Sequence, residues 1–431
     1  FSEKIGQPAT SEEIVRNIMA PGKPHPWRKL WMQNWYEIQR EVALGLAKAV
    51  RDNSPGDTQM GLMSSSPFTH SIEGRQWRGL FEAFSIDGRV THRPHFAPYA
   101  ERVGKSKAGM THMLDVQRDF RPPYGEVAPE IENFPMTRWT KSDTQTWSEM
   151  ALSQFFAADG LFLDLFPFSA NSANEEPEVG ELLDRSRPAL EWIRARFPNT
   201  LATQGVGCPW KQDAQAHVQV RAGKALGELD ASSLEPADYL MAYGVAVSGR
   251  QQAVNALFGT LAWAYDDDAM RELLSGGLLI DSAAADIICR RGFGSLIGVD
   301  LAGYEQREDS LYSLEMTQSR RAGVPPGLYF EHNLIPHVMR IDRLHQGAEE
   351  WTSIITPEKK RIGAGTVAFR NKLGGRVITV AAPKPGQLSK TYQRQTIVHH
   401  MVKFLEGNRP RAVRVEKAPY CMPIHFEEPG R

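Results

Sequence analysis

Short apolar runs alternate with stretches of helical periodicity over about the first 200 residues. In the longer stretches apolar residues return every three or four positions, which predicts amphipathic helices. The shorter runs lead into polar or proline-rich positions, which predicts strands that end in loops. The expected order is a helix at 26–50, a strand at 58–66, a helix at 73–84, strands at 89–99 and 125–135, a helix from 142, a strand at 159–168 and a helix at 178–196. Such alternation is typical of a parallel sheet or a β/α barrel.

The pattern changes near Pro198, where a second alternating region begins. The expected order is a strand at 200–210, a helix and turn at 237–248, a strand at 251–259, a helix from 267, a strand at 277–281, a helix at 282–292, a strand at 294–299, a β-rich region at 304–362, a strand at 374–383 and a helix at 391–407. We therefore expect two α/β domains, at 1–198 and 199–431, the second with a β-rich insertion.

Composition and charge exclude several classes of partner. Of the 431 residues 41% are hydrophobic, and the formal net charge is −1, so no overall field attracts nucleic acid or an anionic membrane. No apolar run reaches the ~18 to 20 residues of a membrane helix. Cys208, Cys289 and Cys421 lie far apart, which argues against a zinc site and a disulfide scaffold and favours a cytoplasmic over a secreted protein. We expect small or neutral partners and no cofactor.

Each predicted strand of the first domain ends in polar side chains. In a β/α barrel the loops after the strands converge over one mouth, where the active site lies. The sequence therefore predicts that polar groups from four strands lie close together. They are Ser64, Ser65 and Ser66; His92, Arg93 and His95; Glu130 and Glu132; and Asp164.

The run "PEIENFP" at 129–135 carries the clearest candidate chemistry. In a strand, Glu130 and Glu132 share one face, because side chains alternate, while Ile131 points into apolar packing and Pro135 ends the strand. Carboxylates inside a barrel are costly unless they are hydrogen-bonded or used. Carboxylates among arginine, histidine and aromatic residues suit glycoside hydrolysis. The alternative is a surface loop with two solvated glutamates.

Two longer runs resemble a known family. "PEIENFPMTRWTKSD", followed by "FFAADGLFLDLFPF", resembles strands seven and eight of the barrel in family 42 β-galactosidases, and "LLSGGLLIDSAAADIICRRGFGSLIGV" resembles their amidotransferase-like domain. The resemblance implies a (β/α)8 TIM-barrel portion followed by a flavodoxin-like three-layer α/β domain. It also implies a retaining glycosidase whose nucleophile is Glu130 or Glu132. Glu130 is preferred, because the family's nucleophile commonly has an acidic or polar residue two places later.

Residues near the strand ends are expected to bind the carbohydrate. Arg93, Arg138 and Lys141 would either favour an acidic sugar or form salt bridges with the carboxylates. The expected substrate-binding residues are His92, Arg93, His95, Tyr99, Arg138, Trp139, Lys141 and Asp164.

Two further interpretations concern the histidines and aromatic residues of this region. His92 and His95 would hydrogen-bond the sugar, or would hold a metal together with Asp164 or Glu130. Large aromatic residues near the mouth could stack on sugar rings, although such residues also fill cores. They are Trp77, Tyr99, Trp139 and Phe168.

The resemblance also implies a missing partner for the nucleophile. The family's general acid lies at the end of strand four, and the long helix at 26–50 already takes the place that follows strand four. Strands one to four and the acid would then lie upstream of Phe1, in the same polypeptide. Half a barrel exposes an edge and an apolar face, so a missing half or a second copy would have to cover it.

The second domain is expected to be non-catalytic. No G-x-C-x-G or G-x-S-x-G elbow is present, and Ser282 at the elbow position reads as a helix N-cap. His399 and His400 are adjacent on a helix and cannot both face one metal, so solvated or capping roles are expected. The resemblance implies that this domain joins subunits, which predicts a homo-oligomer.

Three hypotheses about function remain open at this point. The first is a retaining glycoside hydrolase. The second is a carbohydrate-binding or assembly protein that has the same fold without the chemistry. The third is a metal-dependent barrel hydrolase built on His92, His95 and Asp164.

Overall fold

The computed structural model describes residues 1–101, 107–135, 137–167, 172–306, 312–334, 337–418 and 421–428. The chain forms two compact units. Unit 1 comprises Phe1–Ala202, Gln219–Asp230 and Glu427–Arg431, and unit 2 comprises Thr203–Val218 and Ala231–Phe426. The domain boundary was expected between residues 198 and 199, and the first change of unit comes four residues later, after Ala202. The segment 219–230 also belongs to unit 1, which the sequence did not predict.

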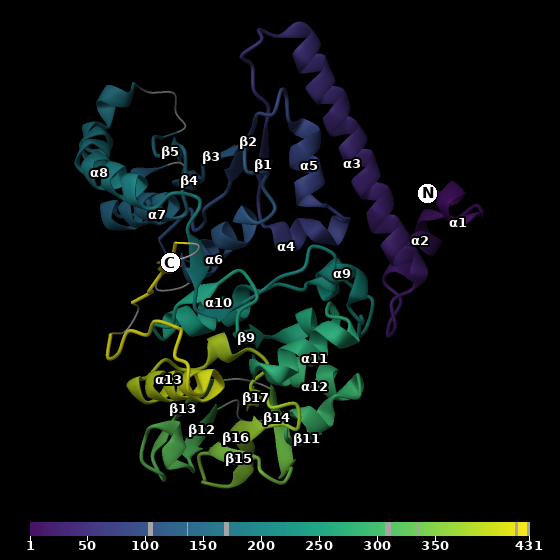
Figure 1. Cartoon of the computed structure of the whole chain (residues 1–431), viewed down its shortest axis with the longest axis vertical. Helices are drawn as coiled ribbons and strands as arrows, with labels where there is room; N and C mark the ends of the chain where they lie inside the picture. Colours follow the sequence, from purple (N-terminus) through teal and green to yellow (C-terminus); the bar gives the residue numbers. More distant parts are fainter. Residues whose placement is uncertain are drawn as a thin grey trace. The chain divides into compact units, whose positions relative to one another are not determined.

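Four parallel strand positions form the sheet of unit 1 (Figure 1). The third position is divided into two short strands, β3 and β4. β2 pairs with β3, and the residues directly after β2 pair with β4. There, His95 forms a parallel bridge to Glu130, and the Phe96 N–H donates to the Glu130 carbonyl at 2.9 Å. The order across the sheet is β1, β2, β3 with β4, then β5. The strands are β1 (Gly61–Ser64), β2 (Val90–Pro94), β3 (Gly125–Val127), β4 (Glu130–Glu132) and β5 (Phe162–Asp164).

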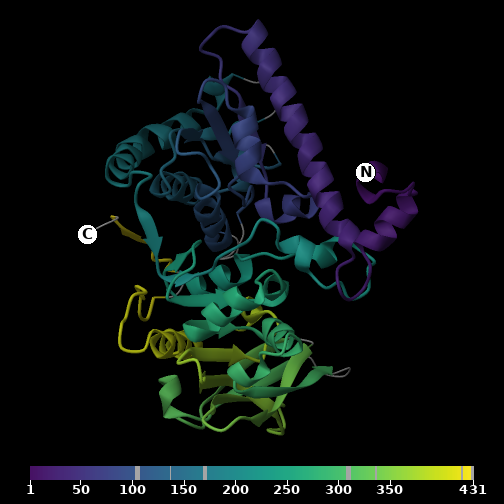
Figure 2. The same ribbon diagram turned by 45° about the vertical axis from the view of Figure 1, so that its right-hand side comes forward.

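A helix follows each of these strand positions. α5 follows β1, α6 follows β2, α7 follows β4 and α8 follows β5, so the expected strand–helix alternation is present. The long helix α3 packs along α5 (Figures 1 and 2). The helices of unit 1 are α1 (Ser2–Ile5), α2 (Ser11–Ile18), α3 (Pro26–Asn53), α4 (Pro67–His70), α5 (Trp77–Phe84), α6 (Lys107–Arg118), α7 (Asp143–Phe155) and α8 (Pro177–Arg196).

Local sequence explains where the two best-predicted helices of unit 1 begin. α3 begins after His25, whose Nδ1 accepts a hydrogen bond from the Trp27 N–H at 3.2 Å, and Pro26 occupies the first helical position. α7 begins after Ser142, whose Oγ accepts from the Gln145 N–H at 3.1 Å. Side-chain oxygens or nitrogens thus satisfy N–H groups that a helix start leaves unpaired.

The sequence pattern did not predict α6. Polar residues including Thr111, His112, Asp115 and Gln117 are buried along it, so the helix lacks the apolar stripe on which a periodicity argument depends.

The two faces of the unit 1 sheet differ in what covers them. The helix-facing side chains, such as Val90 and Ile131, are buried. On the opposite face Met63 is 61% exposed and Phe162 is 46% exposed. These exposures show that the second face is open in the described part of the chain. Parallel sheets are normally covered on both faces, so an open face is unusual.

Unit 2 is built on one nine-stranded sheet. Five parallel strands lie in the order β17, β10, β9, β7, β8, which is fifth, fourth, third, first, second along the chain. Four antiparallel strands extend the sheet beyond β17 in the order β16, β15, β12, β13. β11 and β14 form a separate antiparallel pair. These antiparallel strands make up the expected β-rich insertion.

The bounds of these elements are as follows. The strands outside unit 1's sheet are β6 (Ala202–Gln204), β7 (Val206–Gly207), β8 (Val247–Ser248), β9 (Val254–Leu257), β10 (Gly277–Ile280), β11 (Val299–Gln306), β12 (Tyr312–Thr317), β13 (Tyr329–Leu334), β14 (His337–Leu344), β15 (Glu349–Ile355), β16 (Arg361–Arg370), β17 (Arg376–Val380) and β18 (His425–Glu427). The helices of unit 2 are α9 (Ala214–His217), α10 (Leu234–Ala242), α11 (Asp267–Ser275), α12 (Ser282–Arg290) and α13 (Tyr392–Glu406).

A buried ion pair ties the β-rich insertion to α13. Arg394 Nη1 lies 2.6 Å from Glu315 Oε2, and both side chains are almost inaccessible to solvent. Thr352 Oγ1 donates to Glu315 Oε1 at 2.5 Å, and Arg394 Nη2 donates to the Glu331 carbonyl at 3.0 Å. Buried charges need such partners, because removing one leaves the other desolvated and unpaired.

The elbow between β10 and α12 corrects one expectation. Asp281, not Ser282, is the N-cap of α12: its Oδ1 accepts from the Ala284 N–H at 2.7 Å and from the Gly259 N–H at 2.9 Å. Burial raises the pKa of Asp281 to about 7. The aspartate precedes the helix by one residue and a carboxylate reaches two amides, which a serine hydroxyl at the first helical position does not.

The class of the fold agrees with the sequence prediction: the protein is a mixed α/β structure with several sheets. The helix closed by Gly407 is also present, since α13 ends at Glu406 and Gly407 has a φ of 67°. In the parts of the chain described above, every helix is too short or too polar to cross a membrane.

Candidate active site

The side chain of Glu130, the first residue of β4, is held by one group from the neighbouring strand β2 and by one group from the segment after β2. Its Oε1 accepts a hydrogen bond from the Tyr99 hydroxyl at 2.7 Å, and its Oε2 forms an ion pair with Arg93 Nη2. Arg93 belongs to β2 and Tyr99 to the segment that follows it. Glu130 itself is only 7% exposed. Three positions that are far apart in the sequence therefore meet on the open face of the sheet.

The partners of Glu130 set its ionisation. Burial alone would raise the pKa of this carboxyl, but the hydrogen bond from Tyr99 and the hydrogen bond and positive charge of Arg93 lower the pKa below its usual range. Burial and the contact with Glu130 raise the pKa of Tyr99, so its hydroxyl keeps the proton that it donates. Glu130 is consequently a fixed, ionised carboxylate.

Glu132 lies on the same face, as the alternation along the strand predicted, and behaves in the opposite way. Burial, a hydrogen bond with Glu130 and the negative charges of Glu130 and Asp164 raise the pKa of Glu132. Asp164 is its register partner on β5. Neighbouring carboxyl groups of this kind share a proton, because both cannot easily be charged at once.

Other expected residues complete this face. His95 pairs with Glu130 in the sheet, and its ring lies 5.7 Å from the Tyr99 ring in an edge-on contact. Burial lowers the pKa of His95, so its imidazole is neutral near pH 7. The guanidinium of Arg93 lies over the ring of Phe162, 5.2 Å from its centre. The open face thus combines three carboxyl groups, a cation, a neutral imidazole and an exposed aromatic ring.

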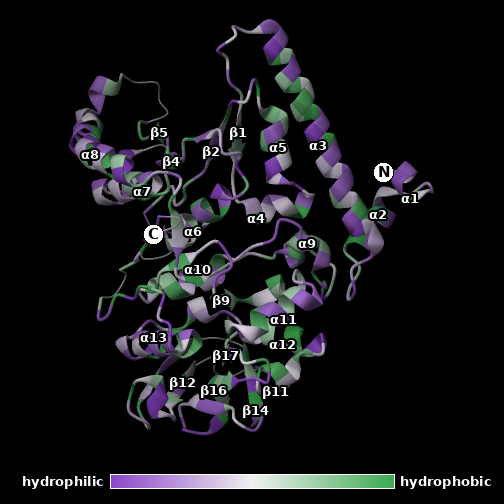
Figure 3. Ribbon diagram, viewed as in Figure 1, coloured by the Kyte–Doolittle hydropathy of each residue, from purple (hydrophilic) through white to green (hydrophobic). Residues whose placement is uncertain are grey.

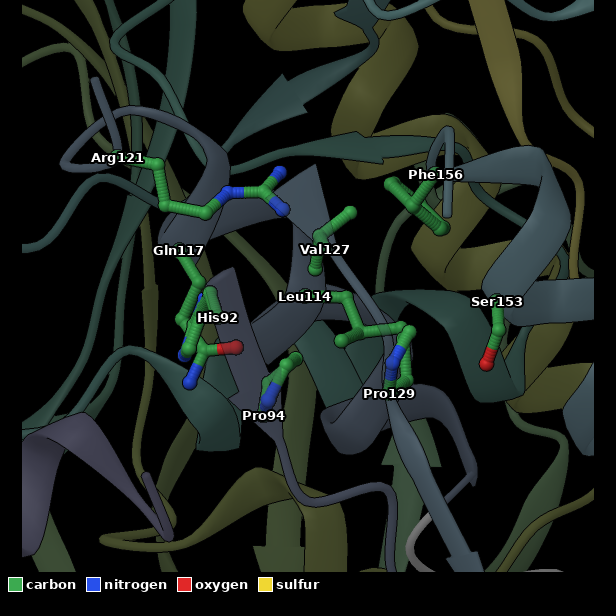
Figure 4. Close-up of a pocket in the computed structure, with 9 residues that line it drawn as sticks. All are labelled: His92, Pro94, Leu114, Gln117, Arg121, Val127, Pro129, Ser153 and Phe156. Atoms are coloured by element: carbon green, nitrogen blue, oxygen red, sulfur yellow. The ribbon is translucent and has the colours of Figure 1, made fainter. Parts of the chain in front are cut away.

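His92 was expected to bind substrate, and this prediction is wrong. It is 1% exposed and lies on the helix-facing side of the sheet, where its Nε2 is 2.7 Å from Ser64 Oγ. Figure 4 shows its ring beside Gln117 of α6, in a small cavity that also reaches Ser153 of α7. Side chains on opposite faces of a strand cannot contact one ligand.

The same placement contradicts the metal hypothesis. His92 and His95 are three positions apart on one strand, so they point to opposite faces and cannot ligate one ion with Asp164. Among the described residues, no group of three or more histidine, cysteine, aspartate or glutamate side chains is arranged to hold a metal.

The basic residues after β4 are engaged in salt bridges. Arg138 lies 3.5 Å from Asp143 and 3.7 Å from Glu178. Lys141 Nζ lies 2.8 Å from Glu149 Oε2, and both side chains are fully buried. Lys141 therefore cannot contact a sugar directly, which corrects its expected role.

Arg93 completes this set, because it too is paired with a carboxylate. Arg93 forms the expected salt bridge with a candidate carboxylate, Glu130, whereas Arg138 pairs with Asp143 and Glu178, and Lys141 pairs with Glu149.

The four aromatic residues proposed for stacking occupy different environments. Trp139 is 97% exposed, whereas Trp77 is fully buried in the core. Tyr99 is a hydrogen-bond donor to Glu130 rather than a free stacking surface. Phe168 lies outside the described residues. Of the three that the structure describes, Trp139 has the exposed ring that stacking on a sugar requires.

Sequence reasoning missed Phe162 and the partners of Lys141. Phe162 pairs in register with Glu130, so the alternation of β5 could have placed it on the open face. The parity of β2 could likewise have separated His92 from Arg93 and His95. No sequence signal identifies Glu149 as the partner of Lys141, because that contact depends on how α7 packs against the loop before it.

No protein-family model matches the chain, and no curated protein matches it at a significant level. Its function must therefore be inferred from the residues and their geometry.

Proposed function

We propose that this chain belongs to a retaining glycoside hydrolase that acts on a galactoside-like or other oligosaccharide or polysaccharide, with Glu130 as the nucleophile. The observation that carries the proposal is the ionised Glu130 carboxylate on the open face of the parallel sheet, fixed by Tyr99 and Arg93. A nucleophilic carboxylate must be charged and correctly oriented before it can attack a sugar carbon.

The residues have distinct tasks in this reaction. A Glu130 oxygen attacks the anomeric carbon, the bond to the leaving oxygen breaks, and a general acid gives that oxygen its proton. Water then attacks the glycosyl-enzyme, the same acid group takes the water's proton, and the Glu130 carboxylate is released. Tyr99 and Arg93 position Glu130 throughout, while Arg93 also balances its charge.

Glu132 does not supply that general acid. It is hydrogen-bonded to Glu130, whereas the two catalytic carboxyl groups of a retaining enzyme stand about 5 to 5.5 Å apart. Its raised pKa instead makes it a proton-sharing neighbour that holds Glu130 in place. The acid must come from a different strand.

Three features of unit 1 support its being half of a (β/α)8 barrel. Within the described residues β1 and β5 each have a strand partner on one side only. The sheet's second face exposes Met63 and Phe162. Apolar residues also lie at several levels along α3 (green in Figure 3), and five large hydrophobic side chains of this helix are exposed. These are Trp35, Ile38, Val42, Leu44 and Leu46.

We assign the missing half to an upstream segment of the same polypeptide rather than to a second copy. Helices α3, α5, α6, α7 and α8 accompany only four strand positions, so two copies would exceed the eight helices of a closed barrel. If the missing half has four strands and three helices, the closed barrel has eight strands and eight helices, and α3 is one of these helices. That half would supply the general acid.

Unit 2 fits a non-catalytic amidotransferase-like domain. The order of its five parallel strands, second, first, third, fourth, fifth, is that of flavodoxin-like folds. At the elbow before α12 the chain places Asp281 as a cap and Ser282 inside the helix, with no cysteine nucleophile there. By the same resemblance unit 2 joins subunits into a homo-oligomer, which analytical ultracentrifugation can test.

A second function is a carbohydrate-binding protein without turnover. The direct ion pair between Arg93 and Glu130 favours it, because a neutralised carboxylate is a weaker nucleophile. A carbohydrate-binding protein would use the same open face and the exposed Trp139. In contrast to the hydrolase, it would form no covalent intermediate.

Covalent trapping separates the two functions. The chain is incubated with a panel of 2,4-dinitrophenyl 2-deoxy-2-fluoroglycosides, whose leaving group departs without protonation, so the missing acid is not needed. Intact mass followed by peptide mapping should find one added fluoroglycosyl group on Glu130. The variant Glu130→Gln should not be labelled, while Glu126→Gln, which alters an exposed glutamate on the neighbouring β3, should be labelled normally.

A label on Glu132 would reassign the nucleophile. If no reagent labels the chain although sugars still bind, the protein is a binding protein or uses an inverting mechanism.

A further inference from the structure

A groove of unit 2 has no part in the chemistry proposed above. It has a volume of about 590 Å³, within the range of small-molecule sites. One wall is a single face of α13, formed by Tyr392, Thr396, His399 and His400 together with the neighbouring Gln395. The other wall is the loop that carries Glu416 and Lys417.

Backbone carbonyls fix the tautomers of the two histidines. His399 Nε2 lies 2.7 Å from the Tyr243 carbonyl, and His400 Nδ1 lies 3.1 Å from the Arg321 carbonyl. Because a carbonyl oxygen only accepts, each of these nitrogens carries the hydrogen. Burial lowers the pKa of both imidazoles, so they are neutral near pH 7. The second nitrogen of each ring is then a hydrogen-bond acceptor.

The charges of the groove offset one another. In the lining, Glu416 adds one carboxylate and Lys417 adds one ammonium group. Arg414 and Glu416 act on both imidazoles with opposite charges, Lys403 also acts on His400, and Arg414 is itself paired with Glu406. A balanced groove has no reason to prefer an anion or a cation. Acceptors outnumber strong donors, so the matching ligand is rich in hydroxyl groups that donate.

An aromatic ring completes the groove. Tyr392 is 59% exposed at the first turn of α13, and its hydroxyl and ring are both open to a ligand. The C–H face of a sugar packs on such a ring while its hydroxyls meet acceptors nearby. A hydroxyl-rich, uncharged ligand with an apolar face is a neutral saccharide.

We propose that this groove is a second carbohydrate-binding site, selective for neutral saccharides. It recognises sugar hydroxyls through the second imidazole nitrogen of His399 and the carboxylate of Glu416, and it recognises the ring face through Tyr392. The groove performs no reaction, and its binding does not depend on whether Glu130 is a nucleophile.

Titration calorimetry with lactose, cellobiose, xylobiose and maltose tests the proposal. The measurements use the Glu130→Gln variant, so that no disaccharide is hydrolysed at the other site. Adding Tyr392→Ala should weaken the binding of at least one disaccharide about tenfold, and Glu416→Gln should weaken the same disaccharide severalfold. The matched control is Tyr329→Ala, which removes an exposed tyrosine of β13 outside the groove and should leave the affinity unchanged.

Location and charge selectivity are tested separately. A photoreactive diazirine derivative of the disaccharide that binds should cross-link to peptides that contain Tyr392–Glu406 or Glu416, and its affinity should not change between low and high salt. The proposal is overturned if no disaccharide binds, if Tyr392→Ala and Glu416→Gln bind as well as their parent, or if the cross-links lie elsewhere. If no disaccharide binds in the groove but Glu130 is still labelled, the proposed function stands and the groove proposal fails. If Glu130 is not labelled but the groove binds a disaccharide, the groove proposal stands and the proposed function fails.

Discussion

The parallel strands of the two units face different surroundings. In unit 2, β9 and β10 are buried at every position, as parallel strands covered on both sides normally are. In unit 1 the strands are buried on the helix side only, and the other face exposes Met63 and Phe162 beside a cluster of ionisable groups. Equivalent positions at the strand ends therefore serve different purposes.

Asp281 and Glu130 show the consequence of this difference. Both are buried carboxyl groups on a parallel strand or directly after one: Asp281 follows β10, and Glu130 is the first residue of β4. Asp281 receives two backbone N–H groups and caps a helix, whereas Glu130 receives a side-chain hydroxyl and a guanidinium that face open space. A carboxyl group held by backbone N–H groups inside the fold is structural, and one fixed by side chains on an accessible face can act on a ligand.

The largest expected effect tests the role of the open face. Glu130→Gln should lower the rate at which the chain releases dinitrophenol from a reactive aryl glycoside by at least about 10³-fold, because the attacking carboxylate is lost. Stopped-flow or steady-state measurements of dinitrophenolate absorbance give the rate. Glu126→Gln, on the exposed end of the same face, should retain the parental rate; equal losses in both variants would contradict the distinction.

The next effect concerns the covered interior of unit 2. Arg394→Met leaves Glu315 buried without its partner and should lower the free energy of unfolding by about 3 to 5 kcal/mol. Arg343→Met removes an arginine whose side chain is 80% exposed, so it should cost at most about 1 kcal/mol. Chemical denaturation followed by circular dichroism measures both. Similar values for the two variants would show that the buried pair contributes no more than a surface pair.

Asp281 gives unit 2 a pH dependence of known sign. Its folded-state pKa of about 7 lies above the unfolded value near 3.9, so folding favours the protonated form. The contribution of Asp281 to the free energy of unfolding is therefore greatest below about pH 4 and falls by roughly 2 to 4 kcal/mol as the pH rises to about 7. Asp281→Asn, which still caps the helix, should remove this part of the slope in denaturation measured from pH 4 to 8.

The exposed Asp268 of α11 is the matched control, and Asp268→Asn should keep the parental slope. If Asp281→Asn keeps it too, the buried carboxyl is not the titrating group.

The smallest effect tests how Glu130 is positioned. Tyr99→Phe removes one hydrogen bond to the carboxylate and should slow trapping by about 10- to 100-fold, equivalent to ~1 to 3 kcal/mol. The pKa of Glu130 should rise towards its usual value, so the acidic limb of the pH–rate profile should move to higher pH. Tyr124→Phe alters an exposed tyrosine of unit 1 and should change neither. A slower reaction with an unmoved profile would indicate a purely structural role for Tyr99.

Periodicity predicted those helices that have one apolar side. The helix expected at 26–50 is α3, and the one expected at 73–84 is α5, whose buried side is apolar. α6 was not predicted because several of its polar residues are buried inside unit 1. A pattern of apolar and polar residues predicts a helix only where the apolar residues are the buried ones. In α6 polar residues are buried as well.

The candidate site was predicted in part. The pairing of Glu130 and Glu132 on one face followed from alternation along the strand, and the same rule applied to β2 would have removed His92. The sequence could not show that Lys141 is enclosed with Glu149, because that ion pair joins a loop to a helix through packing.

The sequence by itself determined the alternation of strands and helices, the shared face of Glu130 and Glu132, and the mixed α/β class. Those properties depend on residues close together in the chain, whose spacing sets which side of an element they occupy. Only the tertiary structure decided that Arg93 and Tyr99 hold Glu130, that Asp281 caps α12, and that one face of the unit 1 sheet is open. These features depend on which strands become neighbours and in what register, because charge and hydrogen bonding act over a few ångströms between residues that the sequence separates widely.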